Sequence, residues 1–221
     1  MKKFWKRMNR GLALALVLVI GLVIYIAVDE GNFRREVPRI EQNLQSYMQQ
    51  LPSIYVTGEA DSATVPQEQI EQKLKDNVAL VQPYWLSTIG SSNGYQYNLD
   101  ALTQDIQQVL QDSTLGNGYV SKLSYTIVGS PQIRKDGPGL AVVETEYSIV
   151  ADYVGTPLIG GVAGTIYPDG YGEDLSESGE EPLRMTVTGY ANFHMQRVDG
   201  DWKITQIDNL GYGANVTPIA E

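Results

Sequence analysis

The sequence predicts an α+β domain that follows one membrane-spanning helix. Residues 34–110 place apolar side chains at helical intervals, and residues from 122 onward alternate apolar with polar side chains. Helices followed by strands pack on one face of a curved antiparallel sheet, here of about three helices and at least four strands. A third observation, a long uncharged segment near the N-terminus, predicts the membrane helix.

That uncharged segment, Gly11–Val28, is long enough to cross a bilayer. As a helix its 18 residues would span about 27 Å, close to the ~30 Å hydrocarbon core. Basic residues in 1–10 precede it and Asp29 follows it, which predicts a cytoplasmic N-terminus and an extracytoplasmic remainder. A cleaved signal peptide is the alternative, but Tyr25 fits its −3 position poorly. We therefore expect an uncleaved anchor in the cell membrane, with the lipid bilayer as partner through residues 11–28.

The charges and the composition exclude several functions. Residues 29–221 carry 11 basic and 26 acidic side chains, a formal charge of −15. Such an acidic chain argues against nucleic acid as a partner, because phosphate binding needs basic side chains. The absence of cysteine excludes disulfides, thiolate metal sites and a cysteine nucleophile.

Residue periodicity places three helices before the strands, over residues 34–51, 67–85 and 99–110. Pro38 fits the first turn of the first helix, and Pro52 ends it. Thr64 with Gln67 resembles a capping box that opens the second helix. Asn98 is a natural N-cap for the third helix.

Alternation predicts four strands, over residues 123–127, 140–153, 183–198 and 202–209. Lys135-Asp136-Gly137 indicates a turn, and Asp199-Gly200 indicates a two-residue hairpin. A Gly-rich and acidic loop covers 155–182, with one short strand at 164–167, and the residues after 211 are expected to be irregular.

The strands also predict which side chains face inward. In the second strand one face carries Val143, Thr145, Tyr147 and Ile149, and the other carries Val142, Glu144 and Glu146. In the third strand the apolar face carries Met185, Val187, Gly189, Ala191, Phe193 and Met195. His194 has the opposite parity, which favours solvent or a partner.

These elements divide the chain into five parts. The expected parts are a cytoplasmic basic tail (1–10), a transmembrane helix (11–28), a juxtamembrane helix and linker (29–65), the extracytoplasmic α+β domain (66–210) and a tail (211–221).

The segment Phe193–Asn209, FHMQRVDGDWKITQIDN, resembles the closing hairpin of the NTF2-like (cone-shaped α+β) superfamily. Its last two strands read as an apolar strand, a charged-Gly turn and then Trp-Lys-Ile, which Val198–Ile204 matches. The resemblance implies that Trp202 fills the core beside the turn and that the concave sheet face forms a pocket. The superfamily includes enzymes, ligand binders and scaffold subunits, so the fold does not choose among them. The size and layout are also similar to VirB8-type conjugation and secretion subunits.

No catalytic, cofactor or metal site is assigned from the sequence. In enzymes of the superfamily an acid inside the cone transfers protons, but the inward set of the second strand has none. Asp152 and Asp208 remain at strand ends, and His194 is the only histidine. Gly160–Gly164, GGVAG, lacks the Gly-Lys-Ser/Thr continuation of a nucleotide loop. We therefore expect that the chain is not an enzyme and holds no cofactor and no metal.

The 14 tyrosines are the most unusual feature of the composition. Tyrosine is enriched at interfaces, although it is also a good strand former. The expected partner or ligand surface consists of Tyr153, Tyr167, Tyr171, Tyr190 and His194. The expected function is a membrane-anchored protein-interaction or assembly domain, as a subunit of an envelope or conjugation/secretion complex, with a protein partner or a second copy. The alternatives are a domain that binds a small apolar ligand and, less favoured, an NTF2-like lyase or isomerase.

Overall fold

The computed structural model describes residues 10–55, 58, 65–86, 97–168 and 181–219. They form two compact units, residues 1–40 and 41–221, which are described separately below. One α-helix, α2 (Arg10–Ile54), contributes its first part to the first unit and its last part to the second.

The described part of the first unit is the stretch of α2 up to Ile40. By length and composition this helix can cross a membrane, and its large apolar side chains between Leu14 and Val28 are exposed. The sequence predicted a break between the membrane helix and residue 34, with Pro38 in a first turn. That prediction was wrong, because the helix runs through Pro38. Ion pairs between residues one turn apart stabilise the helix across this charged stretch. One example is Arg34 with Glu30, at 3.0 Å.

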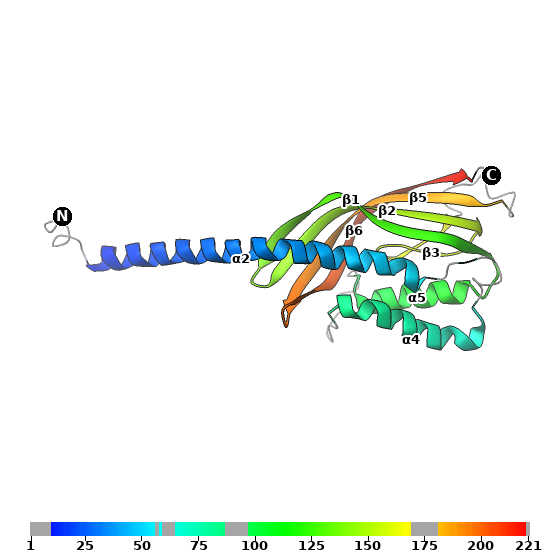
Figure 1. Ribbon diagram of the computed structural model, residues 1–221, viewed down its shortest axis with the longest axis horizontal. Coiled ribbons are helices and arrows are strands. Elements are labelled where there is room, and N and C mark those ends of the chain that lie inside the picture. Colours follow the sequence, from blue (N-terminus) through cyan, green and yellow to red (C-terminus); the bar gives the residue numbers. More distant parts are fainter. Residues whose placement is uncertain (1–9, 56–57, 59–64, 87–96, 169–180, 220–221) are drawn as a thin grey trace. The chain divides into compact units, whose positions relative to one another are not determined.

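A four-stranded antiparallel sheet forms the second unit, in the order β1-β2-β5-β6. The strands are β1 (Gly118–Gly137), β2 (Leu140–Gly155), β5 (Leu183–Val198) and β6 (Asp201–Pro218). In Figure 1 the end of α2, α4 (Ile70–Val81) and α5 (Leu99–Asp112) lie on one face of the curved sheet. This is the predicted α+β arrangement, with helices packed on one face of a curved antiparallel sheet.

The alternating pattern of the strands sets the two faces of the sheet. Along β5 every second residue from Leu183 to Met195 is buried, as predicted, and His194 lies on the opposite face. Hereafter the helix-covered face is called the inner face, and the other the outer face. The hairpin between β5 and β6 was also predicted correctly, since Asp199 and Gly200 have φ values of 53° and 95°.

Both edge strands are longer than predicted. The turn after β1 lies at Pro138-Gly139 rather than at 135–137. The residues after Gly211 are not irregular, because β6 continues to Pro218 and pairs with the first half of β5. Without this extension the edge of that half of β5 would leave backbone groups unpaired.

The helices follow the apolar periodicity. Helix α5 begins at its predicted N-cap, where the Asn98 side chain accepts a hydrogen bond from the Ala101 N–H at 3.0 Å. The predicted second helix is interrupted: short 3₁₀ turns at Gln67–Gln69 and Gln82–Tyr84 flank α4. Thr64, the expected capping residue, lies outside the described residues.

A small hairpin joins β2 to β5. It consists of β3 (Ile159–Gly160) and β4 (Thr165–Ile166), which agrees with the predicted short strand. The rest of the acidic loop, residues 169–180, lies outside the described part of the chain. The hairpin contacts α5, and this contact positions the site described next.

Candidate functional site

An acidic side chain reaches the helix–sheet interface from α5, not from a strand. The inward residues of β2 include no acid, as the sequence indicated, but Asp105 of α5 is half-buried. Asp105 was not among the residues predicted from the sequence. Its spacing of three residues from the buried Leu102 could have indicated its position on the helix.

Groups from two separate segments lie beside the Asp105 carboxyl. The Tyr97 hydroxyl donates a hydrogen bond to Oδ2 at 2.6 Å, and the backbone N–H of Gly164 lies near enough to favour the charged form. Burial nevertheless raises the pKa of Asp105 above its usual range, and these two groups oppose that rise only in part. The carboxyl is thus shifted toward accepting a proton at a higher pH than an exposed aspartate.

The GGVAG segment has a structural role in this site. The Gly161 N–H donates to the Gly164 carbonyl at 2.7 Å, and Gly164 has a φ of +109°, which L side chains rarely adopt. This tight turn presents the Gly164 N–H to Asp105. A Cβ on Gly160 would lie 2.2 Å from Cζ of Tyr55, so glycine is required where the Tyr55 ring crosses the backbone.

Two further tyrosines complete the cluster, Tyr47 of α2 and Tyr55, which directly follows that helix. Tyr47 and Tyr55 are buried, and their hydroxyls have no hydrogen-bond partner among the described residues. The Trp85 N–H lies beside the Tyr47 hydroxyl but does not form a well-aligned hydrogen bond with it. Burial is the main cause that raises the pKa of both tyrosines, and the negative charge of Asp105 raises it further. Both hydroxyls therefore stay protonated at neutral pH.

Together these groups form what we call the Asp105 cluster: Tyr47, Tyr55, Tyr97, Asp105 and Gly164. It combines a carboxyl of raised pKa with neutral hydroxyl donors. A buried hydroxyl without a partner costs about 1–3 kcal/mol, so an acceptor placed beside either tyrosine hydroxyl would be stabilised. A carboxyl of raised pKa together with neutral hydroxyl donors has the chemistry for proton exchange and for stabilising negative charge on oxygen.

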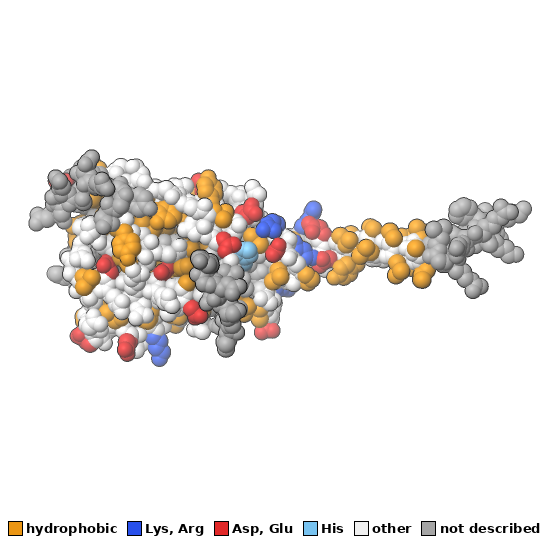
Figure 2. Space-filling model, turned by 180° about the vertical axis from the view of Figure 1, so that it is seen from behind, with side chains coloured by type: hydrophobic (Ala, Val, Ile, Leu, Met, Phe, Trp, Pro, Cys, Tyr) orange, Lys and Arg blue, Asp and Glu red, His pale blue; other side chains and the backbone are white. Residues whose placement is uncertain are grey.

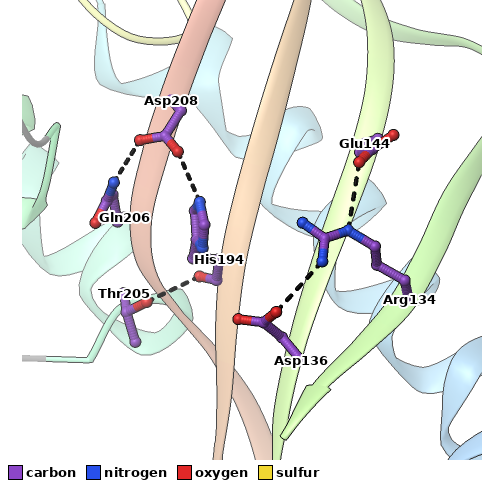
Figure 3. Close-up of polar contacts among 7 residues, drawn as sticks. All are labelled: Arg134, Asp136, Glu144, His194, Thr205, Gln206 and Asp208. Atoms are coloured by element: carbon purple, nitrogen blue, oxygen red, sulfur yellow. Dashed lines mark hydrogen bonds and ion pairs between the residues drawn. The ribbon is translucent and has the colours of Figure 1, made fainter.

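The outer face carries a different set of polar groups. His194 Nε2 lies 2.7 Å from Asp208 Oδ2, and Arg134 bridges Glu144 and Asp136 at 3.4 Å and 3.3 Å (Figure 3). Figure 2 shows the histidine at the surface beside acidic side chains. Asp208 also accepts a hydrogen bond from the Gln206 side chain.

A groove of about 500 Å³ crosses the outer face next to these pairs. A bulge of β1 after Val128 and the bulged Leu210 of β6 lie along it, and Glu144, Glu146 and Asn192 are among its lining residues. The groove and the Asp105 cluster therefore lie on opposite faces of the sheet.

The structure does not gather the predicted partner surface at one place. Tyr153 is buried on the inner face, and Tyr190 and His194 lie on the outer face. Tyr167 accepts a hydrogen bond from Gln108 of α5 at 2.8 Å. Tyr171 lies outside the described residues.

The other acids that the sequence singled out have simple partners. The Asp152 carboxylate forms a two-point ion pair with Arg184, at 2.6 Å and 2.8 Å. Hydrogen bonding to Arg184 holds the pKa of Asp152 below its usual range. Within the described ranges, no group of three or more His, Asp or Glu side chains could hold a metal ion.

Comparisons with known proteins find only distant structural likenesses. No family model matches the chain, and no curated protein matches it significantly. A crystal structure of a candidate aromatic ring hydroxylase from Novosphingobium aromaticivorans is 10% identical, with a TM-score of 0.41, over 84% of this chain and 94% of that chain. A hexachlorocyclohexane dehydrochlorinase, LinA type 2, is 8% identical, with a TM-score of 0.37, over 88% and 93%.

These two structures correct one expectation. Both are named for enzymatic activities, so the prediction that this chain is not an enzyme is contradicted. At these TM-scores neither activity transfers to this chain. What it can do must be argued from its own residues.

Proposed function

We propose that the chain is a membrane-tethered domain that binds a small, mainly apolar molecule at the Asp105 cluster and exchanges a proton with it. The observation that carries this proposal is the half-buried Asp105, whose pKa burial raises, together with buried tyrosine hydroxyls that have no partner among the described residues. A general base works best when its pKa is near the working pH, and burial shifts Asp105 in that direction.

The chemistry fits a molecule with a carbonyl oxygen and an acidic C–H next to it. The Asp105 carboxylate would take the proton from carbon, which breaks the C–H bond and leaves its electron pair in the enolate. The hydroxyls of Tyr47 or Tyr55 would donate to the enolate oxygen, where negative charge develops. Return of the proton to the same or a neighbouring carbon completes an isomerisation without a co-reactant.

The membrane location is a second part of the proposal. The basic cluster of residues 1–10 supports a cytoplasmic N-terminus, and the exposed apolar part of α2 supports an anchor. The domain would then lie outside the cytoplasm. Because the chain has no cysteine, Ser124→Cys on exposed β1 gives a single label. A membrane-impermeant maleimide should label it in intact cells, and labelling only after lysis would contradict this topology.

The catalytic part is tested with the full-length chain in nanodiscs. NMR in D₂O would follow exchange of the α-protons in a panel of small ketones and enones. We expect exchange above the buffer rate for at least one compound, and a loss of about 100-fold or more in Asp105→Asn, because general bases contribute about 10²–10⁴-fold.

Two further variants make that test specific. Asp201→Asn removes an exposed carboxyl at the start of β6 and should leave the exchange unchanged. Tyr55→Phe removes one hydroxyl and should slow exchange while leaving the fold intact. Equal exchange by wild type and Asp105→Asn, or exchange no faster than buffer for every compound, would contradict proton transfer at Asp105.

An assembly role in an envelope complex remains a second proposed function. The layout of basic tail, single helix and external domain, similar to VirB8-type subunits, supports it. The structure adds one specific observation in its favour, the groove on the outer face of the sheet.

A further inference from the structure

The groove on the outer face is a second candidate site, separate from the Asp105 cluster. At both ends of the groove the regular pairing of the strands is interrupted. Between Val128 and Gln132 the register of β1 against β2 shifts, and the register of β6 shifts at Leu210. Bulges re-aim side chains and bend the strand, so they border the groove across the middle of the sheet.

Negative charge dominates the floor of this groove. Glu144 is balanced by Arg134, which is itself shared with Asp136. Among the described residues, the Glu146 carboxylate makes no hydrogen bond or ion pair, and it is a lining residue of the groove. Beyond the floor, His194 is paired with Asp208. An approaching ligand therefore meets at least one uncompensated carboxylate.

Exposed apolar side chains border the same carboxylate. Tyr190, which pairs directly with Glu146 across the strands, is 55% exposed. Leu210 is 61% exposed and Val128 is 41% exposed. Exposed large apolar side chains gathered at one place are typical of an interaction surface. An aromatic ring next to a carboxylate suits a cation that also contacts the ring.

A second copy of this chain fits the groove poorly. A two-fold contact through this face would bring Glu146 of each copy close to the same acidic groove of the other. Residues 29–221 also carry a formal charge of −15, which adds repulsion at longer range. The charge pattern favours a partner of the opposite sign.

We propose that the outer groove binds an extended segment of another protein in which lysine or arginine alternates with apolar side chains. A basic side chain would pair with Glu146 and lie against the ring of Tyr190. Its apolar neighbours would pack on Val128 and Leu210. This surface is independent of the chemistry proposed at Asp105, so either proposal can fail alone.

The test uses the full chain in nanodiscs of phosphatidylcholine, a neutral lipid that does not itself attract basic peptides. A fluorescein-labelled peptide, Lys-Leu-Lys-Val-Lys-Leu, is titrated with protein, and anisotropy reports binding. The matched peptide replaces each Lys with Glu. We expect the basic peptide to bind and the acidic peptide to bind at least tenfold more weakly, with affinity falling as salt rises.

Point variants locate the contact. Glu146→Gln should weaken the basic peptide about threefold to fivefold, the effect of one partly exposed ion pair. Tyr190→Ala should weaken it by a similar factor or more. The control Glu71→Gln, on the exposed side of α4, should leave binding unchanged. Circular dichroism of each variant separates loss of contact from loss of fold.

Several results would overturn the proposal. These are no binding of the basic peptide, equal binding of both peptides, or equal effects of Glu146→Gln and Glu71→Gln. Displacement of the peptide by micromolar spermidine would instead indicate a site for small amines. A dimer in detergent that Tyr190→Ala dissociates would assign the face to a second copy.

Discussion

The two faces of the sheet come from the same strands, yet they bring different chemistry together. The inner face meets three helical segments and buries its polar groups, so Asp105 and the tyrosines have shifted pKa values. The outer face keeps His194 and Asp208 in a pair that is only partly buried, and Arg134 in exposed pairs. Burial alone therefore separates a site suited to proton exchange from a surface suited to recognition.

This difference follows from the two-residue period of strands. On β5, Phe193 is fully buried, and its neighbour His194 is 31% exposed at the side chain. One step along the backbone thus changes both the solvent and the kind of partner that a residue meets. Substitutions at neighbouring positions are the most direct way to test how separate the two faces are.

The largest difference is expected between Phe193→Ala and His194→Ala. Loss of a buried phenylalanine should lower the free energy of unfolding by about 3–5 kcal/mol, because it leaves a cavity beside Tyr47. Loss of His194 removes one partly exposed pair and should cost about 1 kcal/mol or less. Thermal unfolding followed by tryptophan fluorescence measures both. Similar losses would mean that the outer face is structurally coupled to the core.

A smaller loss is expected at Gly189, where the inner face is closely packed. A Cβ there would lie 2.5 Å from the Tyr147 hydroxyl and 2.8 Å from Cβ of Tyr212. Gly189→Ala should therefore destabilise the chain by about 1–3 kcal/mol, as overpacking does. Gly213→Ala is the matched control, since nothing lies within 4 Å of its added Cβ. Unfolding midpoints that shift equally in both variants would contradict this account.

Local patterns were enough to predict most of the strands and the start of α5. The β5 alternation, the Asp199-Gly200 turn and the Asn98 cap each depend on residues close in sequence. The extension of β6 was not predictable in that way. It depends on pairing with Leu183, which is distant in the chain, and no local alternation marks residues 211–218.

The Asp105 cluster shows why the candidate site could not be read from the sequence. Its members come from α2 and the residue after it, from the segment before α5, from α5 itself and from the β3–β4 hairpin. Each is unremarkable in its own segment: GGVAG indicates a loop, and Asp105 looks like a polar helix residue. Only the tertiary fold brings Gly164 and Tyr97 to the same carboxyl.

A third prediction compares two aspartates of opposite pKa shift, beginning with Asp152. Because Arg184 lowers the pKa of Asp152, its carboxylate stabilises the fold above the usual aspartate pKa of about 3.9. That stabilisation is lost as the pH falls through the lowered pKa of the folded state. Asp152→Asn should cost about 1 kcal/mol at pH 7 and flatten the acid side of the stability profile. An unchanged profile would show that the ion pair adds nothing.

Asp105 should behave in the opposite way, with the smallest effect. Since burial raises its pKa, its contribution is most favourable below the usual aspartate pKa, about 3.9, and is lost as the pH rises through the raised value. Asp105→Asn keeps the shape of the carboxyl group but removes its negative charge at pH 7. It should therefore raise the unfolding midpoint at pH 7 by about 1–2 °C, a modest shift because the group is only half-buried. Scanning calorimetry at pH 4 and pH 7 should show the gain only at pH 7. A lower midpoint in Asp105→Asn would mean that the charged carboxylate stabilises the fold, which would contradict this prediction. A higher midpoint would mean that the charge costs stability and is kept for the proposed chemistry.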